Sequence, residues 1–219
     1  MPTTPSDPAG GAPRWERRKE SRPAELLDAA LELFVERGYA ATRLDDIAAR
    51  AGVSKGTLYL YFANKEELFK ALIRENIVSL IDRFRAEIER SDLPAPALVE
   101  HFMRVWWRDF GSTRLAGLAK LVMAEAGNFP EVARFFHDEV IRPNGELFGS
   151  ILARGVARGE FRAVDVPTAA HLWIAPLVMK AMWSHSFDLC RIAGTSPDPQ
   201  HMLDVHLSLI LAALRPDAR

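Results

Sequence analysis

The chain has 219 residues, enough for one large domain or two small ones, and its 48% hydrophobic content supports a packed core. A net charge of −1 does not mark a nucleic-acid binder, so any DNA site must come from the local placement of cations. The single cysteine, Cys190, cannot form a disulfide within the chain, and the longest apolar run, from Leu172 to Met179, is too short for a membrane span. Since no signal-peptide pattern follows Met1, we expect a cytoplasmic protein with no membrane partner.

Residues 1–21 are rich in proline, glycine and charge, and we expect them to form a flexible arm. Within this segment Arg17, Arg18 and Lys19 are candidates for a contact with the minor groove or the DNA backbone. The same cations also fit a solvated tail that contacts nothing.

The next residues predict two short helices. Apolar residues at helical spacing indicate a helix over about 23–37, and Gly38 stands where a glycine commonly ends a helix. A second helix is predicted over about 43–51, where Thr42 and Asp45 have the spacing of a capping box.

Further helices continue to the end of the chain without any alternating strand pattern. Ser54 is placed to cap a short helix over about 55–62, and Asn64 to cap a long fourth helix. Pro143 and Pro176 fall inside helical patterns, where kinks are expected. The later helices are predicted at about 97–110, 112–125, 130–158, 166–190 and 199–214, which gives an all-α fold of about nine helices.

The second and third helices have the spacing of a helix-turn-helix. Ala48 is small enough for the two helices to approach each other, and Gly52 can adopt the backbone conformation of a tight turn. Leu58 and Phe62 would hold the third helix against the first, which leaves its polar and aromatic residues outside. A short helix of this kind is suited to the major groove of DNA.

Residues 26–70, above all the stretch IAARAGVSKGTLYLYFANKEELF, resemble the DNA-binding domain of the TetR family of bacterial repressors. The resemblance implies a homodimer in which a helix-turn-helix domain, residues 22–69, binds double-stranded operator DNA. It also implies that residues 70–219 bind a small-molecule effector and form the dimer interface. The function expected is therefore a ligand-responsive repressor that is released from a palindromic operator.

Position by position, the resemblance assigns Tyr59, Lys65 and the hydroxyl of Thr42 to phosphates, and Lys55 to a phosphate or a guanine edge. The other positions would approach or read the bases, although Leu60 also fits a partly exposed filler residue, and Ser54 a helix cap only. The complete predicted set is Thr42, Ser54, Lys55, Gly56, Thr57, Tyr59, Leu60, Tyr61 and Lys65.

Aromatic residues and methionines gather after residue 100, a composition that lines an apolar ligand cavity and also fills an ordinary core. Such a cavity would take a hydrophobic or aromatic effector. No histidine pair has metal-ligand spacing with carboxylate support, so neither a metal nor a cofactor is expected. The predicted ligand-binding residues are Met103, Trp106, Phe110, Met123, Phe135, His137, Trp173 and Met179.

The last helix, about 199–214, is apolar on two faces, so its own core can cover only one of them. The second face is assigned to the dimer interface, and consists of Met202, Val205, Leu209 and Ala212. No nucleophile–base motif, metal spacing or phosphate loop points to an enzyme. The alternatives are a helical-bundle enzyme or sequestering protein that retains a helix-turn-helix, and a TetR-type activator without a small-molecule effector.

Overall fold

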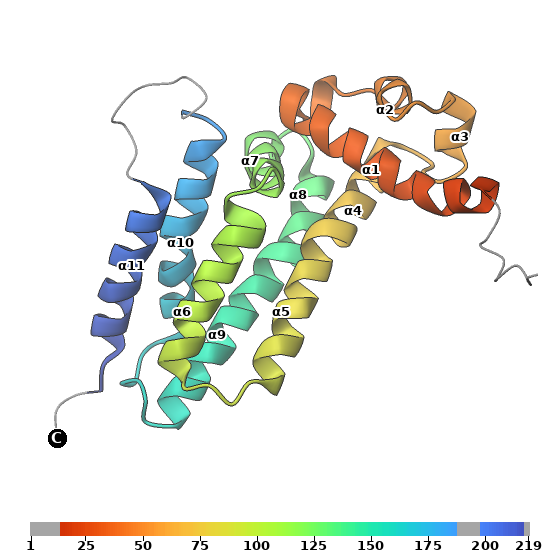
Figure 1. Cartoon of the computed structure of the whole chain (residues 1–219). Coiled ribbons are helices and arrows are strands. Elements are labelled where there is room, and N and C mark those ends of the chain that lie inside the picture. Colours follow the sequence, from red (N-terminus) through yellow and green to blue (C-terminus); the bar gives the residue numbers. More distant parts are fainter. Residues whose placement is uncertain (1–13, 188–197, 217–219) are drawn as a thin grey trace, which may run out of the picture.

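The computed structural model describes the backbone of residues 14–187 and 198–216, with side chains from residue 22 onward. All regular structure in these ranges is helical, as expected for the all-α class (Figure 1). When helices that continue through a π-turn are counted once, the described ranges contain nine helices. The side chains of Arg17, Arg18 and Lys19, and the whole of Cys190, lie outside the described residues.

The N-terminal domain consists of α1 (Arg14–Ala41), α2 (Leu44–Arg50) and α3 (Lys55–Tyr59). The first helix begins well before residue 23, so the backbone of residues 14–21 is helical and differs from the predicted flexible arm. Gly38 interrupts α1 with a φ of 83°, a conformation that glycine adopts at little cost. The predicted end of the helical run at this residue is therefore confirmed.

Two predicted helix caps are confirmed and one is wrong. The Ser54 side chain accepts a hydrogen bond from the Thr57 N–H at 3.1 Å, and Asn64 accepts one from the Glu67 N–H at 2.8 Å. By contrast, Thr42 does not cap α2, because Arg43 is the N-cap residue and makes no side-chain cap.

The remaining helices form a bundle below the N-terminal domain, with α11 at its outer edge (Figure 1). A connecting helix leads from one to the other, and we use this name for α4, η1 and α5 together. In chain order the bundle contains α4 (Lys65–Ile73), η1 (Arg74–Val78), α5 (Ser79–Arg90), α6 (Ala95–Trp106), η2 (Trp107–Gly111), α7 (Leu115–Glu125), α8 (Pro130–Phe136), η3 (His137–Ile141), α9 (Arg142–Ala157), α10 (Val166–Ser184) and α11 (Pro199–Leu214).

The three π-turns, η1, η2 and η3, share one stabilising feature. A π-turn holds one more residue than an α-helical turn and so disturbs the regular pairing of backbone carbonyls. In each case the residue whose N–H closes the turn also uses its side chain to bond the next carbonyl. These pairs are Ser79 with the carbonyl of Glu75, Ser112 with that of Arg108, and Arg142 with that of Asp138.

The buried core is continuous from the N-terminal domain into the bundle. At the junction the ring of Tyr39 packs edge-on against Phe69 of α4 at 5.3 Å and against Phe129 at 4.8 Å. Deeper in the bundle Trp173 packs against Phe148 with ring centroids 4.9 Å apart. The N-terminal domain is therefore attached to the bundle through aromatic contacts of its own core.

Candidate DNA interface and ligand cavity

The predicted helix-turn-helix is present in α2 and α3. Gly52 has a φ of 67° in the turn, and Ala48 is buried where the two helices meet. Leu58 is fully buried and Phe62 nearly so, as the sequence predicts for the residues that hold α3. With these side chains turned inward, α3 presents its opposite face to solvent.

Five of the nine predicted DNA-contacting residues are exposed, and all five lie on α3 or at its two caps, Ser54 and Leu60. Leu60 is 83% exposed and Tyr59 46% exposed, and Lys55 and Gly56 are also exposed. Thr57 is half-buried, with its hydroxyl 2.8 Å from that of Ser54; Tyr61 is half-buried as well. This arrangement can reach base edges and phosphates of a major groove, although DNA contact itself stays a prediction.

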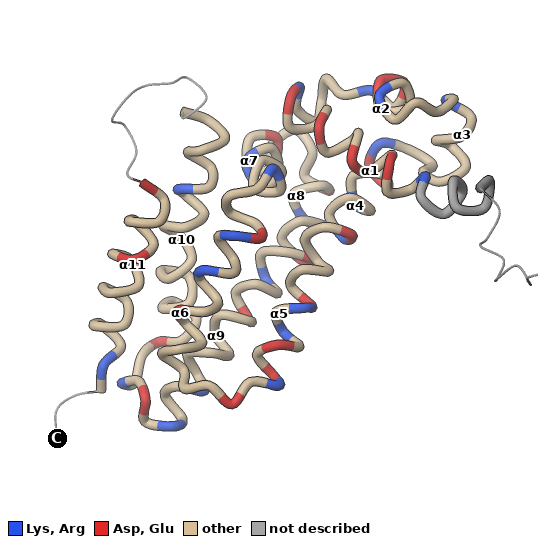
Figure 2. Tube along the Cα trace, in the orientation of Figure 1, with Lys and Arg blue, Asp and Glu red and all other residues tan. Residues whose placement is uncertain are grey.

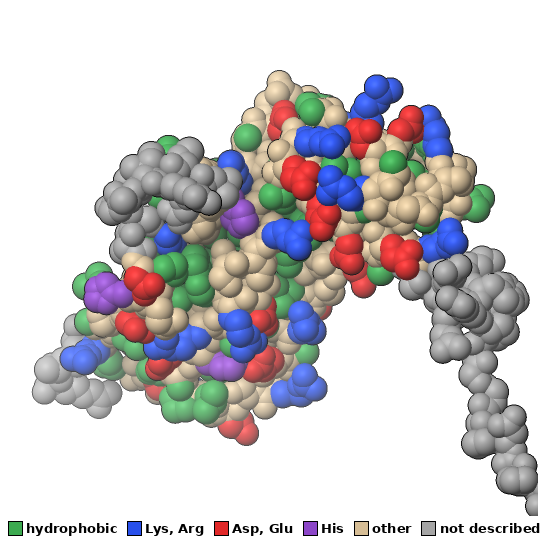
Figure 3. All heavy atoms as spheres, turned by 45° about the horizontal axis from the view of Figure 1, so that its top comes forward, with side chains coloured by type: hydrophobic (Ala, Val, Ile, Leu, Met, Phe, Trp, Pro, Cys, Tyr) green, Lys and Arg blue, Asp and Glu red, His purple; other side chains and the backbone are tan. Residues whose placement is uncertain are grey.

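Lys55 is paired with an acid of its own domain. Its Nζ lies 2.8 Å from Asp45, and 5.9 Å from the centroid of the Tyr59 ring. The carboxylate of Asp45 raises the pKa of the Lys55 ammonium. Because both partners are exposed, a DNA phosphate can replace Asp45 at small cost. Figure 3 shows cations and acids interspersed over the surface of the N-terminal domain. This distribution agrees with a DNA site that depends on the placement of single charges.

Thr42 does not fit its predicted phosphate contact. Thr42 is only 1% exposed, and its hydroxyl donates a hydrogen bond to the carbonyl of Gly38 at 2.7 Å. The carbonyl of Leu33 is a second acceptor, 3.2 Å from the same hydroxyl oxygen. The hydroxyl therefore supplies a hydrogen-bond donor to a carbonyl at the end of α1, and it faces away from solvent.

Lys65 also departs from its predicted phosphate contact. Its Nζ donates to the carbonyls of Tyr39 at 2.7 Å, Thr42 at 3.1 Å and Ala40 at 3.2 Å. An ammonium group has three N–H donors, so these carbonyls use all of them.

A surface ion network joins the N-terminal domain to α7. Glu32 of α1 lies 2.9 Å from Arg50 of α2 and 3.1 Å from Arg114, which precedes α7. The two guanidinium groups, Arg114 first, lower the pKa of the Glu32 carboxyl. Close by, Gly117 of α7 packs tightly on Val35, which a Cβ at residue 117 would meet at 3.1 Å.

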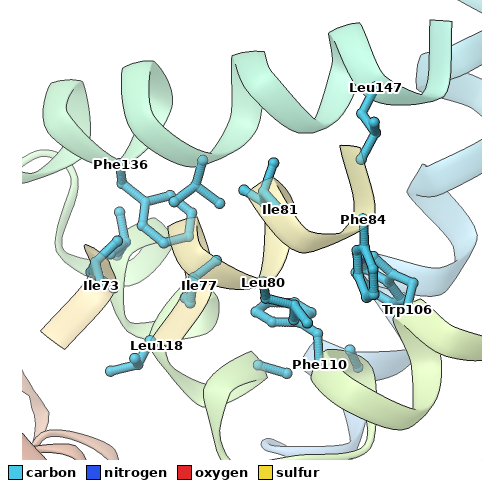
Figure 4. Packing of buried hydrophobic residues seen from close by; sticks show 14 of the residues in the cluster. Ile73, Ile77, Leu80, Ile81, Phe84, Trp106, Phe110, Leu118, Phe136 and Leu147 are labelled. Atoms are coloured by element: carbon cyan, nitrogen blue, oxygen red, sulfur yellow. The ribbon is translucent and has the colours of Figure 1, made fainter. Parts of the chain in front are cut away.

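The bundle holds a cavity of about 720 Å³ whose wall is almost entirely apolar. The cavity is open to the surface on one side, where Met123, Ile141 and Met179 are more than half exposed. One side is formed by the connecting helix, from which Ile77, Leu80, Ile81 and Phe84 face inward (Figure 4). The three π-turns each contribute to the wall, through Ile77 in η1, Phe110 in η2, and Val140 with Ile141 in η3. The sequence predicted this long fourth helix but not its part in the cavity wall, for which its regular apolar stripe was the available signal.

Half of the predicted ligand-binding residues line this cavity. Trp106, Phe110, Met123 and Met179 do so.

The other four predicted ligand-binding residues, Met103, Phe135, His137 and Trp173, do not line the cavity. Met103 and Trp173 are buried core residues, and Trp173 packs on Phe148. Phe135 is turned toward Arg74, whose guanidinium lies 4.9 Å from its ring centroid, while His137 is exposed and bonded to Asp138.

Three polar residues interrupt the apolar wall of the cavity: Asn144 and Glu146 of α9, and His171 of α10. Glu146 and His171 are exposed, which places them on the side of the cavity that reaches the surface. Glu146 is also bonded to Arg142 at 3.2 Å. Polar groups of a ligand can meet these side chains while its apolar part lies inside.

The outer face of α11 is exposed and apolar. Leu203, Leu207 and Leu214 are buried against the bundle, whereas Val205 is 44% and Leu209 64% exposed. Of the other predicted interface residues, Ala212 is exposed and Met202 half-buried. Figure 2 shows that α10 and α11 are nearly free of charge, so this face is suited to burial by another surface.

Within the described ranges, no group of three or more histidine, cysteine or acidic residues could hold a metal ion. Nor does any helix in these ranges have the length and hydropathy needed to span a membrane.

Comparisons with protein families agree with this architecture. Residues 26–72 match the family model of bacterial regulatory proteins of the tetR family, and residues 98–188 match the model of the tetracyclin repressor-like C-terminal domain.

Individual relatives give the same result. The repressor KstR2 of Rhodococcus jostii is 33% identical over 153 residues, which cover 69% of this chain and 74% of KstR2. A fatty acid metabolism regulator protein of Bacillus subtilis is 29% identical over 161 residues, covering 70% and 79% of the two chains. The activator FasR of Mycolicibacterium smegmatis is 46% identical, but over 79 residues only, and the match spans 36% of either chain.

Solved structures share the fold. The transcriptional regulator FadR of Bacillus subtilis, solved in complex with stearoyl-CoA, aligns with a TM-score of 0.73 and 23% identity, over 88% of this chain and 99% of FadR. FadR of Bacillus halodurans aligns with a TM-score of 0.72 and 22% identity, over 87% and 94%.

Proposed function

This chain belongs to the TetR family of bacterial regulatory proteins, and we propose that it represses transcription from a palindromic operator until a long-chain acyl ligand fills its cavity. The single observation that carries the choice of ligand is the size and apolar character of the cavity.

The cavity favours an effector with a long apolar tail and a polar head. A tail can be buried between Phe84 of the connecting helix and Trp106, and the head can remain near Asn144, Glu146 and His171. A fatty acyl group, free or as a thioester, has this form. The similarity to a fatty acid metabolism regulator and to a FadR solved with stearoyl-CoA supports the same class.

On the DNA side, we assign α3 to the major groove. Lys55 would exchange Asp45 for a phosphate, Tyr59 would contact a second phosphate, and Thr57 and Leu60 would meet base edges. A second copy of the chain, joined through the apolar outer face of α11, would place a second α3 about 34–36 Å away, one turn of the double helix.

The connecting helix provides a path between the two sites. It forms one wall of the cavity with Ile77 and Phe84, and its first turn lies against the DNA-binding domain at Lys65. A ligand that fits best when this helix has moved would weaken operator binding, and a 100-fold effect needs about 2.7 kcal/mol of coupling. By reciprocity, operator DNA must weaken ligand binding by the same factor.

A chain-length series tests the ligand. Tryptophan fluorescence should report the titration of CoA thioesters with chains of about eight to sixteen carbons, because Trp106 lines the cavity. Each methylene that becomes buried contributes about 0.8 kcal/mol, so affinity should rise about fourfold per methylene, and roughly 200-fold over four, until the cavity is full. An affinity that does not depend on chain length would refute a tail-binding cavity.

Two substitutions on α7 give a matched control. Ala119→Phe places a large side chain in the cavity wall, and should abolish the rise in affinity with chain length. Ala124→Phe makes the same change at an exposed position and should leave the series unchanged.

Transcription in vitro from a promoter that carries the operator tests the sign of regulation. Repression predicts that the protein lowers the transcript level and that the acyl ligand restores it. A transcript level raised by the protein would instead assign the activator role of the similar FasR.

A further inference from the structure

Lys65 is the first residue of α4, yet its side chain belongs to the end of α1. We call residues 38–43 the α1–α2 corner. The Lys65 ammonium donates to three carbonyls of this corner at 2.7, 3.1 and 3.2 Å, and its Nζ lies 4.5 Å from the centroid of the Tyr39 ring. Three donors and an aromatic face therefore account for the whole ammonium group.

The corner compensates the positive charge inside the protein. The carbonyls at the end of a helix have no intrahelical partners and carry the negative end of the helix dipole, so they are a favourable site for a cation. Lys65 is half-buried, and desolvation lowers the pKa of its ammonium, with a smaller opposing effect from Glu125. Moving this group to a phosphate would leave the corner without its donors.

The contacts join two elements that must keep a fixed orientation. The corner leads directly into α2 and the recognition helix α3, and it is itself closed by the Thr42 hydroxyl on the Gly38 carbonyl. On the other side, α4 continues into the cavity wall. The Lys65 ammonium is therefore a polar link between these two elements.

We propose that Lys65 is a positioning residue, which fixes the angle between the connecting helix and the recognition helix, and is not a phosphate contact. The inference rests on DNA binding by the dimer and does not depend on the identity of the effector.

Salt dependence and operator spacing separate the two roles. With an operator selected from a random duplex pool, Lys65→Met should lower affinity roughly tenfold through misorientation of α3. The slope of log affinity against log salt should stay that of the unaltered protein. The preference for the selected spacing over an operator with one extra central base pair should weaken. A phosphate contact predicts instead a slope smaller by about 1.8 for two subunits, with spacing preference intact.

Lys65→Arg gives the opposite expectation for the two roles. A guanidinium keeps the charge and binds phosphate well, so a phosphate contact would survive this change. Its planar fork cannot place three donors on carbonyls that converge on one nitrogen, so a positioning residue should behave as in Lys65→Met. Operator binding by Lys65→Arg equal to that of the unaltered protein would overturn the proposal.

Lysine reactivity in the unaltered protein tests the proposal without any variant. Under reductive methylation, Lys65 should react slowly in free protein and equally slowly with operator bound. Exposed Lys55 is the matched control, since it should react readily in free protein and become protected by operator. A Lys65 that reacts readily in free protein and is protected only by operator would refute the positioning role.

Discussion

Replacing Thr42 by valine separates a structural hydroxyl from a DNA-contacting one. Valine keeps the shape of the side chain but removes the hydroxyl that donates to the Gly38 carbonyl at 2.7 Å, at a site only 1% exposed. A buried acceptor that loses its donor costs about 1–3 kcal/mol. For a chain of this size about 2 kcal/mol corresponds to a fall in Tm of roughly 4–8 °C.

Thermal unfolding followed by circular dichroism measures this loss, at one protein concentration because the stability of a dimer depends on concentration. Thr57→Val is the matched control, since its half-buried hydroxyl lies on α3 beside Ser54. The control should change operator preference and leave the Tm nearly unaltered. If Thr42→Val left the Tm unchanged and reduced the salt slope of operator binding, the hydroxyl would contact phosphate and our reasoning would be wrong.

Three further predictions concern stability. Burial raises the pKa of the Tyr39 phenol to about 12 from an ordinary value of 10. The contribution of the neutral phenol to folding stability is therefore complete below pH 10 and is lost as the pH rises to 12. Urea unfolding across this range should show the loss, and Tyr39→Phe should remove this dependence on pH. Gly155→Ala should cost about 1–3 kcal/mol in urea unfolding, because its new methyl would overlap the ring of Phe161, whereas Gly127→Ala meets nothing within 4 Å and should be nearly neutral. Asn64→Ala removes the α4 cap and should cost about 1 kcal/mol by the same assay, and an unchanged midpoint would contradict the cap.

The sequence was sufficient for features that depend on neighbouring residues. The caps at Ser54 and Asn64 require only a short polar side chain three residues before an N–H, and the break at Gly38 requires only a residue that tolerates positive φ. The helix-turn-helix is equally local, because Gly52 and Leu58 lie within one short segment.

Features that depend on distant packing were less predictable. Residue type alone does not say that the Thr42 hydroxyl turns back to α1, or that Lys65 reaches carbonyls more than twenty residues earlier in the chain. The same holds for the aromatic cluster, where Trp106 faces the cavity and Trp173 fills the core. Helix periodicity gives the apolar face, and only the neighbouring helices decide whether that face meets a cavity or a side chain.

The distance between Lys65 and the cavity wall determines how large a displacement of the connecting helix at the cavity is needed to change its tilt. Ile77 is twelve residues beyond Lys65, and at 1.5 Å per residue the lever between them is about 18 Å long. A displacement of about 1.5 Å at Ile77, typical of helix shifts in switching proteins, tilts this length of helix by about 5°. The tilt is transmitted to the α1–α2 corner only if the hydrogen bonds of Lys65 hold. If these contacts were loose, the helix would tilt without moving the corner. The mechanism therefore requires two features of the same helix: a rigid polar link at Lys65 and a cavity wall at Ile77.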